Sequence, residues 1–349
     1  MKNNSSHILV IRLSAMGDVA MTVPVLAAFF EKYPNVKITV LTRKFLAPVF
    51  EPFPNVSVFE AEVKGRHQGF LGLWRLFREL KSLNIDVVAD LHNVLRSNIL
   101  KSFFAFTSIP FEQIDKGRLE KKVLTALKGG ELKNSLKSTH QRYVDVFSNL
   151  GFSFDLSHAK PIDVLITSNK VKELVSGVSK KKIGIAPFAA YKSKMYPLEF
   201  MEDVICELNK SKAYQIFFFG GGATEIKVLQ NFDTTYKNAV NCAGLLTFQE
   251  ELQLISKLDI MVAMDSGNAH LAANYGVPIL TLWGVTHPYA GFSPFNFGKN
   301  EMLMADRSVY PLIPTSIYGN KFPEGYENAM TTISPAEILR NIEKILLSN

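Results

Sequence analysis

A short polar turn between two apolar segments contains the residues with the clearest potential for chemistry. In DIMVAMDSGNAHLAANYGVPILTLWG, residues 259–284, an apolar β segment leads through Asp265, Ser266 and Gly267 into residues 268–275, which have helical spacing. A helix that begins beyond the carboxyl end of a parallel strand presents free N–H groups and its dipole to a phosphate. The turn could equally be structural, with Asp265 or Ser266 as the N-cap. The spacing alone leaves both interpretations open.

A carboxylate occupies a comparable position near the N-terminus. The first apolar β segment, residues 7–13, runs into RLSAMGD, and Asp18 is expected where the following helix, residues 18–31, begins. Asp18 could act as a general base toward a substrate hydroxyl, could cap the helix, or could do both. The turn lacks the G-x-G-x-x-G motif of nicotinamide-binding domains, which weighs against a dehydrogenase.

Further candidates follow β segments in the second half of the chain. The segment IGIAPFAAYKSKMYPLEF places Lys192 and Lys194 in a loop, where a cation could neutralise a leaving diphosphate or simply be solvated. In FFFGGGATE, Glu225 could accept hydrogen bonds from ribose hydroxyls, although the helix dipole favours a carboxylate there in any case. His270 could contact a phosphate or be a satisfied core histidine.

Two series of alternating β and helical segments must position these residues. The β segments are expected at 7–13, 36–41, 86–90, 182–187, 214–219, 239–242, 259–263 and 277–282, and the helices at 18–31, 70–83, 96–106, 139–150, 198–208, 223–232, 248–258 and 268–275. Such alternation is typical of parallel sheets covered by helices. A chain of 349 residues is too long for one ordinary core.

We therefore predict an α/β protein with two doubly wound, Rossmann-like domains, residues 1–165 and 166–333. They are expected to face one another across a cleft at the carboxyl ends of their strands. The last segment, residues 334–349, is predicted to form an amphipathic helix that could cross back to the first domain. Residues 288–330 show no clear pattern, and we assign no site there.

The charge of the chain is unevenly distributed. Residues 1–165 contain 22 Lys and Arg against 15 Asp and Glu, whereas residues 166–349 contain 17 of each. A basic half suits an anionic partner, or keeps a surface solvated. Nucleic acid is the weaker option because aromatic residues for base stacking are not interleaved with the cations.

The cysteines and the lengths of the apolar segments indicate the cellular compartment of the protein. Cys206 and Cys242 cannot form a disulfide framework, and no Cys/His cluster has metal-binding spacing. No apolar run is long enough to span a bilayer, and the N-terminus has no signal-peptide pattern. These observations predict a cytoplasmic protein with reduced thiols.

Taken together, the motifs resemble those of glycosyltransferase family 9, the ADP-heptose:lipopolysaccharide heptosyltransferases. The matching segments are RLSAMGDVAMTVPVL, DVVADLHNVLRS, KSKMYPLEF, FFFGGGATE, CAGLLTFQEELQLISKLDIMVAMDSGNAH and GVPILTLWGVTHP, and they occur in order over nearly the whole chain. Tyr196 stands where the family usually has Trp, and Phe188 replaces a common Gly after Pro187. Residues 288–330 match only loosely.

The resemblance implies a GT-B fold and an inverting transfer of heptose from ADP-heptose to a lipopolysaccharide inner-core acceptor, without a cofactor or metal. The absence of a D-x-D carboxylate pair agrees with a metal-independent reaction. Asp18 would be the catalytic base, and Lys194 would neutralise the leaving diphosphate. The implied donor-nucleotide site consists of Lys192, Glu225, Asp265, Ser266, Gly267, His270 and Thr286.

The implied acceptor is a lipid-anchored core sugar that carries carboxylates and phosphates, held by the N-terminal domain. The candidate acceptor-binding cations are Arg66, Arg96, Lys101, Arg118, Lys121 and Lys122. The helix at 70–83, with Trp74, Phe70 and three cations, could touch the cytoplasmic membrane face, although a crossover helix is the favoured interpretation. The alternatives are a GT-B transferase for another nucleotide sugar and a non-catalytic nucleotide-sugar or polyanion-binding protein.

Overall fold

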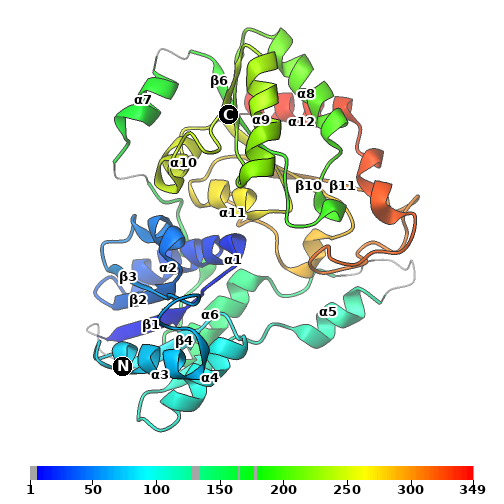
Figure 1. The fold of residues 1–349 in the computed structure, drawn as a ribbon. Helices are drawn as coiled ribbons and strands as arrows, with labels where there is room; N and C mark the ends of the chain where they lie inside the picture. Colours follow the sequence, from blue (N-terminus) through cyan, green and yellow to red (C-terminus); the bar gives the residue numbers. More distant parts are fainter. Residues whose placement is uncertain (1–5, 127–131, 133, 164–165, 177–178, 349) are drawn as a thin grey trace. The chain divides into compact units, whose positions relative to one another are not determined.

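The computed structural model describes residues 6–126, 132, 134–163, 166–176 and 179–348. The chain divides into two compact units (Figure 1). The first unit consists of residues 1–117 and 137–162, and the second of residues 118–136 and 163–349. Residues 118–136 thus belong to the second unit, although they lie within the range expected for the first domain.

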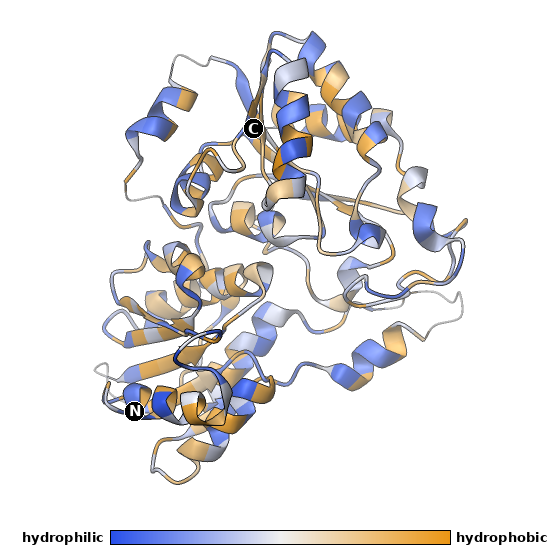
Figure 2. Ribbon diagram, in the orientation of Figure 1, coloured by the Kyte–Doolittle hydropathy of each residue, from blue (hydrophilic) through white to orange (hydrophobic). Residues whose placement is uncertain are grey.

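The first unit is built on a five-stranded parallel sheet with the order β3-β2-β1-β4-β5. Its strands are β1 (His7–Ile11), β2 (Lys37–Thr42), β3 (Val56–Glu60), β4 (Val87–Asp90) and β5 (Phe111–Gln113). Figure 2 shows these strands largely in hydrophobic colours, as expected for a parallel sheet with both faces covered. The strand order reverses between β1 and β4, which is where α/β sheets bind ligands at their carboxyl ends.

The helices of the first unit cover its sheet. They are α1 (Met16–Ala20), α2 (Thr22–Lys32), α3 (Gly69–Lys81), α4 (Leu95–Phe104) and α6 (Thr139–Asn149), with 3-10 turns η1 (Lys44–Phe50) and η2 (Leu156–His158). Leu9 and Ile11 of β1 pack in one core with apolar residues of α3 and α4. The alternate residues of β1 face the opposite side of the sheet. α3 connects β3 to β4 and is the crossover helix that we favoured.

The single helix expected at residues 18–31 is two helices, and the reason is local. Thr22 Oγ1 donates a hydrogen bond to the carbonyl of Val19 at 2.6 Å, close to the end of α1. Pro24 has no N–H to donate to the carbonyl of Ala20, so the helical ladder is interrupted at that point. α1 is therefore a short separate turn that contains Asp18.

The second unit contains a six-stranded parallel sheet with the order β11-β10-β9-β6-β7-β8. Its strands are β6 (Lys181–Ala186), β7 (Tyr214–Phe218), β8 (Ala239–Asn241), β9 (Ile260–Met264), β10 (Ile279–Trp283) and β11 (Asn300–Met304). The order reverses between the central strands β6 and β9. The loops that follow these two strands contain Lys194 and Asp265, so both candidates lie at the expected ligand-binding edge.

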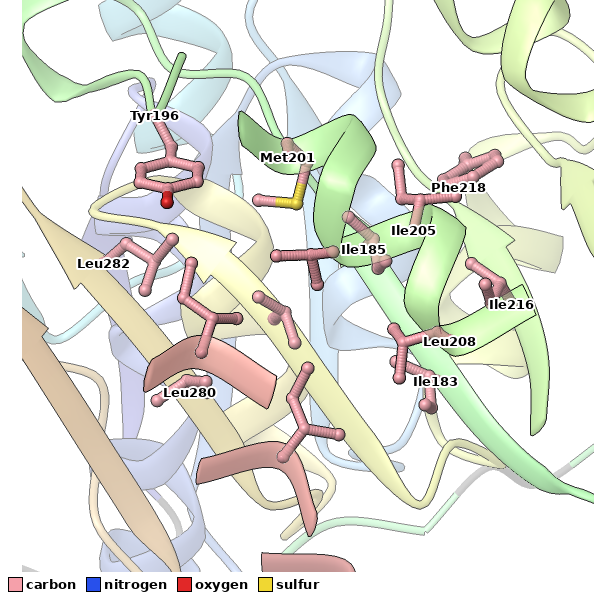
Figure 3. Packing of buried hydrophobic residues seen from close by; sticks show 14 of the residues in the cluster. Ile183, Ile185, Tyr196, Met201, Ile205, Leu208, Ile216, Phe218, Leu280 and Leu282 are labelled. Carbon is pink, nitrogen blue, oxygen red and sulfur yellow. The ribbon is translucent and has the colours of Figure 1, made fainter. Parts of the chain in front are cut away.

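The helices of the second unit are α5 (Arg118–Leu124), α7 (Asn169–Val175), α8 (Leu198–Lys210), α9 (Ala223–Thr235), α10 (Phe248–Ile255), α11 (Gly267–Asn274) and α12 (Pro335–Leu347), with 3-10 turns η3 (Lys192–Lys194), η4 (Pro288–Ala290) and η5 (Tyr326–Thr332). Apolar side chains of α8, α9 and α12 share one core with those of β6, β7 and β10 (Figure 3). None of the helices within the described ranges is long and apolar enough to cross a membrane.

The C-terminal segment forms the amphipathic helix α12. Of the two places open to it, the structure shows packing against α8 within the second unit. Ile338, Ile342 and Ile345 form its buried stripe and join the same core as β6 and α8. An amphipathic helix has one apolar stripe to bury, and here the second sheet's core receives it.

Candidate functional site

Three candidate residues of the second unit form one buried cluster. Lys194 Nζ lies 2.8 Å from Asp265 Oδ2, and Thr286 Oγ1 donates a hydrogen bond to the same oxygen at 2.9 Å. Only 13% of the Lys194 side chain and 9% of the Asp265 side chain are exposed. The loops after β6, β9 and β10 thus bring a cation, a carboxylate and a hydroxyl together at the carboxyl ends of three adjacent strands. Charged groups held out of water act more strongly on a ligand than solvated ones.

The turn that carries Lys194 is packed tightly against two glycines. Ser193 Oγ donates a hydrogen bond to the carbonyl of Gly319, and the carbonyl of Ser193 accepts one from Val285 N at 3.3 Å. A Cβ at Gly284 would collide with the backbone oxygen of Ser193, and one at Gly319 would lie 2.6 Å from the Lys194 stem. The absence of side chains at these two glycines allows the turn to reach its position.

The aromatic residue after this turn anchors it to the core. Tyr196 is buried, and its hydroxyl donates a hydrogen bond to the carbonyl of Ile333 at 2.7 Å. Burial raises the pKa of Tyr196. Tyr196 thus fills a core position and satisfies a buried carbonyl, at the place where the resemblance expected Trp.

Replacing Gly284 with Ala should therefore disturb the turn. Because the obstacle is the Ser193 carbonyl rather than a flexible side chain, we expect Gly284→Ala to cost about 1–3 kcal/mol of unfolding free energy. Chemical denaturation measures this loss. Gly221→Ala is the matched control, since a Cβ there meets nothing within 4 Å. Equal stabilities for the two variants would contradict the proposed packing.

The N-terminus of α11 contains the next three candidates. Ser266 is the N-cap in backbone terms, yet its side chain makes no capping bond, and its buried Oγ has no hydrogen-bond partner among the described residues. The Asp265 carboxylate is instead held by Lys194 and Thr286. Gly267 begins the helix, and His270 is buried one turn later. The N-terminus of α11 therefore has no side-chain cap from Asp265 or Ser266. Its first N–H groups remain suited to binding a phosphate.

Glu225 and Lys192 occupy different environments at the same end of the sheet. Glu225 lies in the first turn of α9, and its Oε2 accepts a hydrogen bond from Gly221 N at 2.8 Å. Its second carboxylate oxygen could still accept from a ligand hydroxyl. Lys192, in contrast, is exposed at the start of η3. The structure therefore brings Lys194, Asp265 and Thr286 into contact but leaves Lys192 outside that cluster.

In the first unit, Asp18 is held by a residue that we did not predict. Its Oδ2 lies 2.5 Å from Arg12 Nη2 and accepts a hydrogen bond from Ala15 N at 3.2 Å. The Asp18 side chain is 26% exposed, so solvent and ligands can reach it. The carboxylate caps the start of α1, and Tyr143 donates a hydrogen bond to its backbone carbonyl at 3.2 Å. Both roles considered for Asp18, cap and base, are compatible with this geometry.

Arg12 is itself firmly positioned. Its Nη1 donates to the carbonyl of Leu91 at 2.6 Å, and it is only 5% exposed. Burial lowers the pKa of Arg12, but Tyr143, Asp18 and Asp90 outweigh this and raise the pKa above its usual value. Arg12 could have been identified from the sequence as a charged residue that directly follows the apolar run of β1, at the end of the strand where ligands bind.

The candidate acceptor-binding cations do not form one cluster. Arg66 is ion-paired, with its Nη2 2.5 Å from Glu79 and its Nε 3.1 Å from Glu62. Arg96 and Lys101 are exposed on α4, and Arg118 and Lys122 are exposed on α5 in the second unit. Lys121 is buried, with Nζ 4.2 Å from the centre of the Phe292 ring.

The second unit also has a pocket of about 730 Å³ in the region to which we assigned no site. It is lined by Leu132, Ser135, His287, Pro288, Tyr289, Ser293, Met302, Met304 and Arg307. The carbonyl of Tyr289 accepts a hydrogen bond from Leu136 N at 2.8 Å, which joins residues 118–136 to this loop. His287 follows Thr286, so the pocket adjoins the Lys194 cluster along the chain. Within the described ranges, no group of three or more His, Cys, Asp or Glu could hold a metal ion.

His287, which lines this pocket, contributes to the free energy of unfolding in a way that depends on pH. Burial and the nearby Arg307 lower the pKa of His287 to about 4. Between pH 6.5 and 4 the unfolded chain binds the proton that the folded protein excludes, so this contribution falls as the pH falls. Burial and Arg12 lower the pKa of His92 to about 3, so its contribution to stability also falls as the pH falls. Burial raises the pKa of Glu251 to about 7, so its contribution to stability rises as the pH falls.

A comparison with His287→Asn isolates this contribution. We expect the stability advantage of the wild type over the variant to shrink by roughly 1–2 kcal/mol between pH 7 and 5. Urea denaturation at the two pH values measures it. A constant difference between the two proteins would show that the histidine titrates alike in the folded and unfolded states.

Comparison with known proteins identifies the family of the chain. Residues 73–306 match the family described as glycosyltransferase family 9 (heptosyltransferase). The chain belongs to glycosyltransferase family 9. This confirms the resemblance and makes the protein a glycosyltransferase with the GT-B fold of two Rossmann-like domains.

Other members of glycosyltransferase family 9 are similar over nearly the whole chain. The lipopolysaccharide core heptosyltransferase OpsX of Haemophilus influenzae is 24% identical over 349 residues, covering 96% of both chains. The solved glycosyl transferase family 9 structure from Veillonella parvula has a TM-score of 0.78 at 21% identity and covers 100% of this chain and 99% of that one. The structure of E. coli heptosyltransferase WaaC with ADP-2-deoxy-2-fluoro heptose has a TM-score of 0.68 at 15% identity, covering 97% and 99%.

Proposed function

We propose that the protein is an inverting heptosyltransferase that transfers heptose from ADP-heptose to the inner core of lipopolysaccharide. The observation that carries the proposal is the buried Lys194–Asp265–Thr286 cluster beside the N-terminus of α11. The relatives support the sugar and the acceptor, since OpsX is a lipopolysaccharide core heptosyltransferase and WaaC has been solved with an ADP-heptose analogue.

The second unit would bind the nucleotide and stabilise its departure. When the glycosidic bond breaks, negative charge develops on the diphosphate of ADP. The positive charge of the Lys194 ammonium group, which is held by Asp265, and the partial positive charges of the N–H groups at the start of α11 are already fixed in place. Ser266 Oγ would donate a hydrogen bond to a phosphate oxygen, and Glu225 would accept from the ribose hydroxyls. We propose that these groups neutralise the leaving group without a divalent ion.

The first unit would supply the proton acceptor. Asp18 is partly exposed and lies beside Arg12, and a carboxylate can take a proton from a substrate hydroxyl. Glycosyl transition states have oxocarbenium character, so the acceptor hydroxyl attacks an already positive carbon. The hydroxyl can then lose its proton late, and a carboxylate suffices as the base. Attack opposite to the departing ADP inverts the configuration.

The acceptor would be an anionic, lipid-anchored saccharide. The surplus of cations in residues 1–165 suits its carboxylates and phosphates. We propose that Arg66, Arg96, Lys101, Arg118, Lys121 and Lys122 contribute to this attraction, and that the protein works at the cytoplasmic face of the inner membrane.

A panel of nucleotide sugars tests the proposal. We expect ADP-heptose to raise the melting temperature more than GDP- or UDP-sugars at equal concentration, since binding to the folded state stabilises it. With a core-saccharide acceptor, ADP-heptose should then release ADP, and chelation by EDTA should leave the rate unchanged. Preference for another nucleotide would indicate a different GT-B transferase. Binding without turnover would indicate a non-catalytic protein.

A further inference from the structure

The outer face of α3 exposes large apolar side chains that are not buried in the core of the first unit. The inner face is buried through residues such as Leu76 and Phe77. On the outer face Phe70 is 64% exposed, Leu71 82% and Trp74 45%. Single exposed apolar residues are ordinary on protein surfaces, but neighbouring ones on one helix face indicate an interaction surface.

Two of these rings are fixed in place rather than loosely solvated. α3 and α4 lie side by side (Figure 1). Phe103 of α4 is nearly buried and meets Phe70 edge-on at 5.3 Å and Trp74 edge-on at 5.0 Å between ring centres. Phe106, just beyond α4, is 91% exposed, and its amide donates to the Phe103 carbonyl. Phe70 and Trp74 are therefore preorganised.

The same face is strongly positive. Arg75, Arg78 and Lys81 are all exposed on the later turns of α3. The only acid in α3 is Glu79, and its Oε2 is occupied by Arg66 at 2.5 Å and by the ring of His67 at 3.0 Å. α4 adds two cations, Arg96 and Lys101, and no acid.

We propose that the outer face of α3, consisting of Phe70, Leu71, Trp74, Arg75, Arg78 and Lys81, docks the protein on an anionic phospholipid surface. Aromatic and aliphatic residues enter the headgroup region, and the cations contact the lipid phosphates. A second copy of the chain is a poor occupant, because two such faces would place like charges together. The inference rests on the proposed function only in that a lipid-anchored acceptor gives the enzyme a reason to bind the membrane.

Flotation with lipid vesicles tests the docking surface. We expect the full-length protein to bind vesicles of phosphatidylglycerol and phosphatidylcholine, to bind pure phosphatidylcholine far less, and to dissociate as salt rises. The triple variant Arg75→Gln, Arg78→Gln, Lys81→Gln should lose roughly 100-fold in partitioning, at roughly fivefold for each cation. The double variant Leu71→Glu, Trp74→Glu should lose at least about tenfold.

Matched controls use exposed residues of the second unit. Lys212→Gln, Lys227→Gln, Lys237→Gln removes the same charge, and Val309→Glu, Leu347→Glu changes the same number of exposed apolar side chains. Both controls should bind vesicles like the wild type. Equal losses in the controls and the α3 variants would overturn the proposal, as would self-association that the Leu71→Glu, Trp74→Glu variant abolishes.

A second readout separates this inference from the proposed function. With a deacylated, water-soluble acceptor, the α3 variants should release ADP from ADP-heptose at the wild-type rate, because no bilayer is involved. Normal turnover together with unchanged vesicle binding in the α3 variants refutes only the docking surface. Absence of turnover in the wild type, together with α3-dependent vesicle binding, refutes only the proposed function.

Discussion

Asp18→Asn is expected to lower ADP release by about 100- to 10,000-fold while leaving nucleotide binding intact, since general base catalysis contributes on this scale. The amide is nearly the same size as the carboxylate but cannot take the acceptor proton. Asp18 belongs to the first unit, whereas the nucleotide candidates Lys194, Asp265 and Glu225 belong to the second. The substitution should therefore change kcat and leave the thermal shift caused by ADP unchanged.

Two further measurements separate a catalytic role of Asp18 from a structural one. Asp163→Asn, at an exposed carboxylate where the chain enters the second unit, should retain wild-type turnover. Asp18→Asn also removes the ion pair with the buried Arg12, so the stability of the variant must be measured by denaturation alongside the kinetics. If ADP binding disappears along with turnover, Asp18 is a structural residue and the assignment of the base fails.

Lys194→Met is expected to affect both catalysis and stability. Loss of one preorganised charge at a developing anion typically lowers kcat by about 100- to 1,000-fold. The substitution also leaves the Asp265 carboxylate buried without its cation, which costs roughly 3–5 kcal/mol. Thr286 alone, with a single hydrogen bond to the same oxygen, cannot compensate.

The double variant Lys194→Met, Asp265→Asn separates the two effects. Removing both charges should restore most of the unfolding free energy, because no uncompensated charge remains, while ADP release stays low. Lys192→Met, two residues away but exposed, should change stability by no more than about 0.5 kcal/mol. Recovery of activity in the double variant would mean that Lys194 serves the fold and not the leaving group.

The central elements of the fold could be predicted because their signals are local. β1, β4, β6, β9 and β10 are apolar runs buried on both faces, and the structure has each of them close to the expected residues. β3 and β11 were missed because they are edge strands with only partly buried side chains and no continuous apolar run. β5 has just three residues.

The site was predictable to the extent that it depends on strand ends. Lys194, Asp265 and Thr286 each follow a buried strand, and parallel strands bring such residues to one edge. Their shared contact at one Asp265 oxygen could not be foreseen, because it depends on the close packing of the Lys194 turn against Gly284 and Gly319. Arg12 was missed because it lies within the expected β segment, although β1 ends one residue earlier.

Residues 118–136 had no sequence signal for their place in the second unit, and this connectivity has a consequence for biosynthesis. They leave the ribosome before the residues they contact, since Leu136 bonds to Tyr289 and Lys121 lies over Phe292. At about 5–20 residues per second, the nascent chain waits roughly 10–30 s for that surface. During this interval Lys121 and Leu124, both buried in the finished protein, have no completed unit to pack against. Residues 118–136 can therefore complete their packing only after the loop that contains Tyr289 and Phe292 has been synthesised.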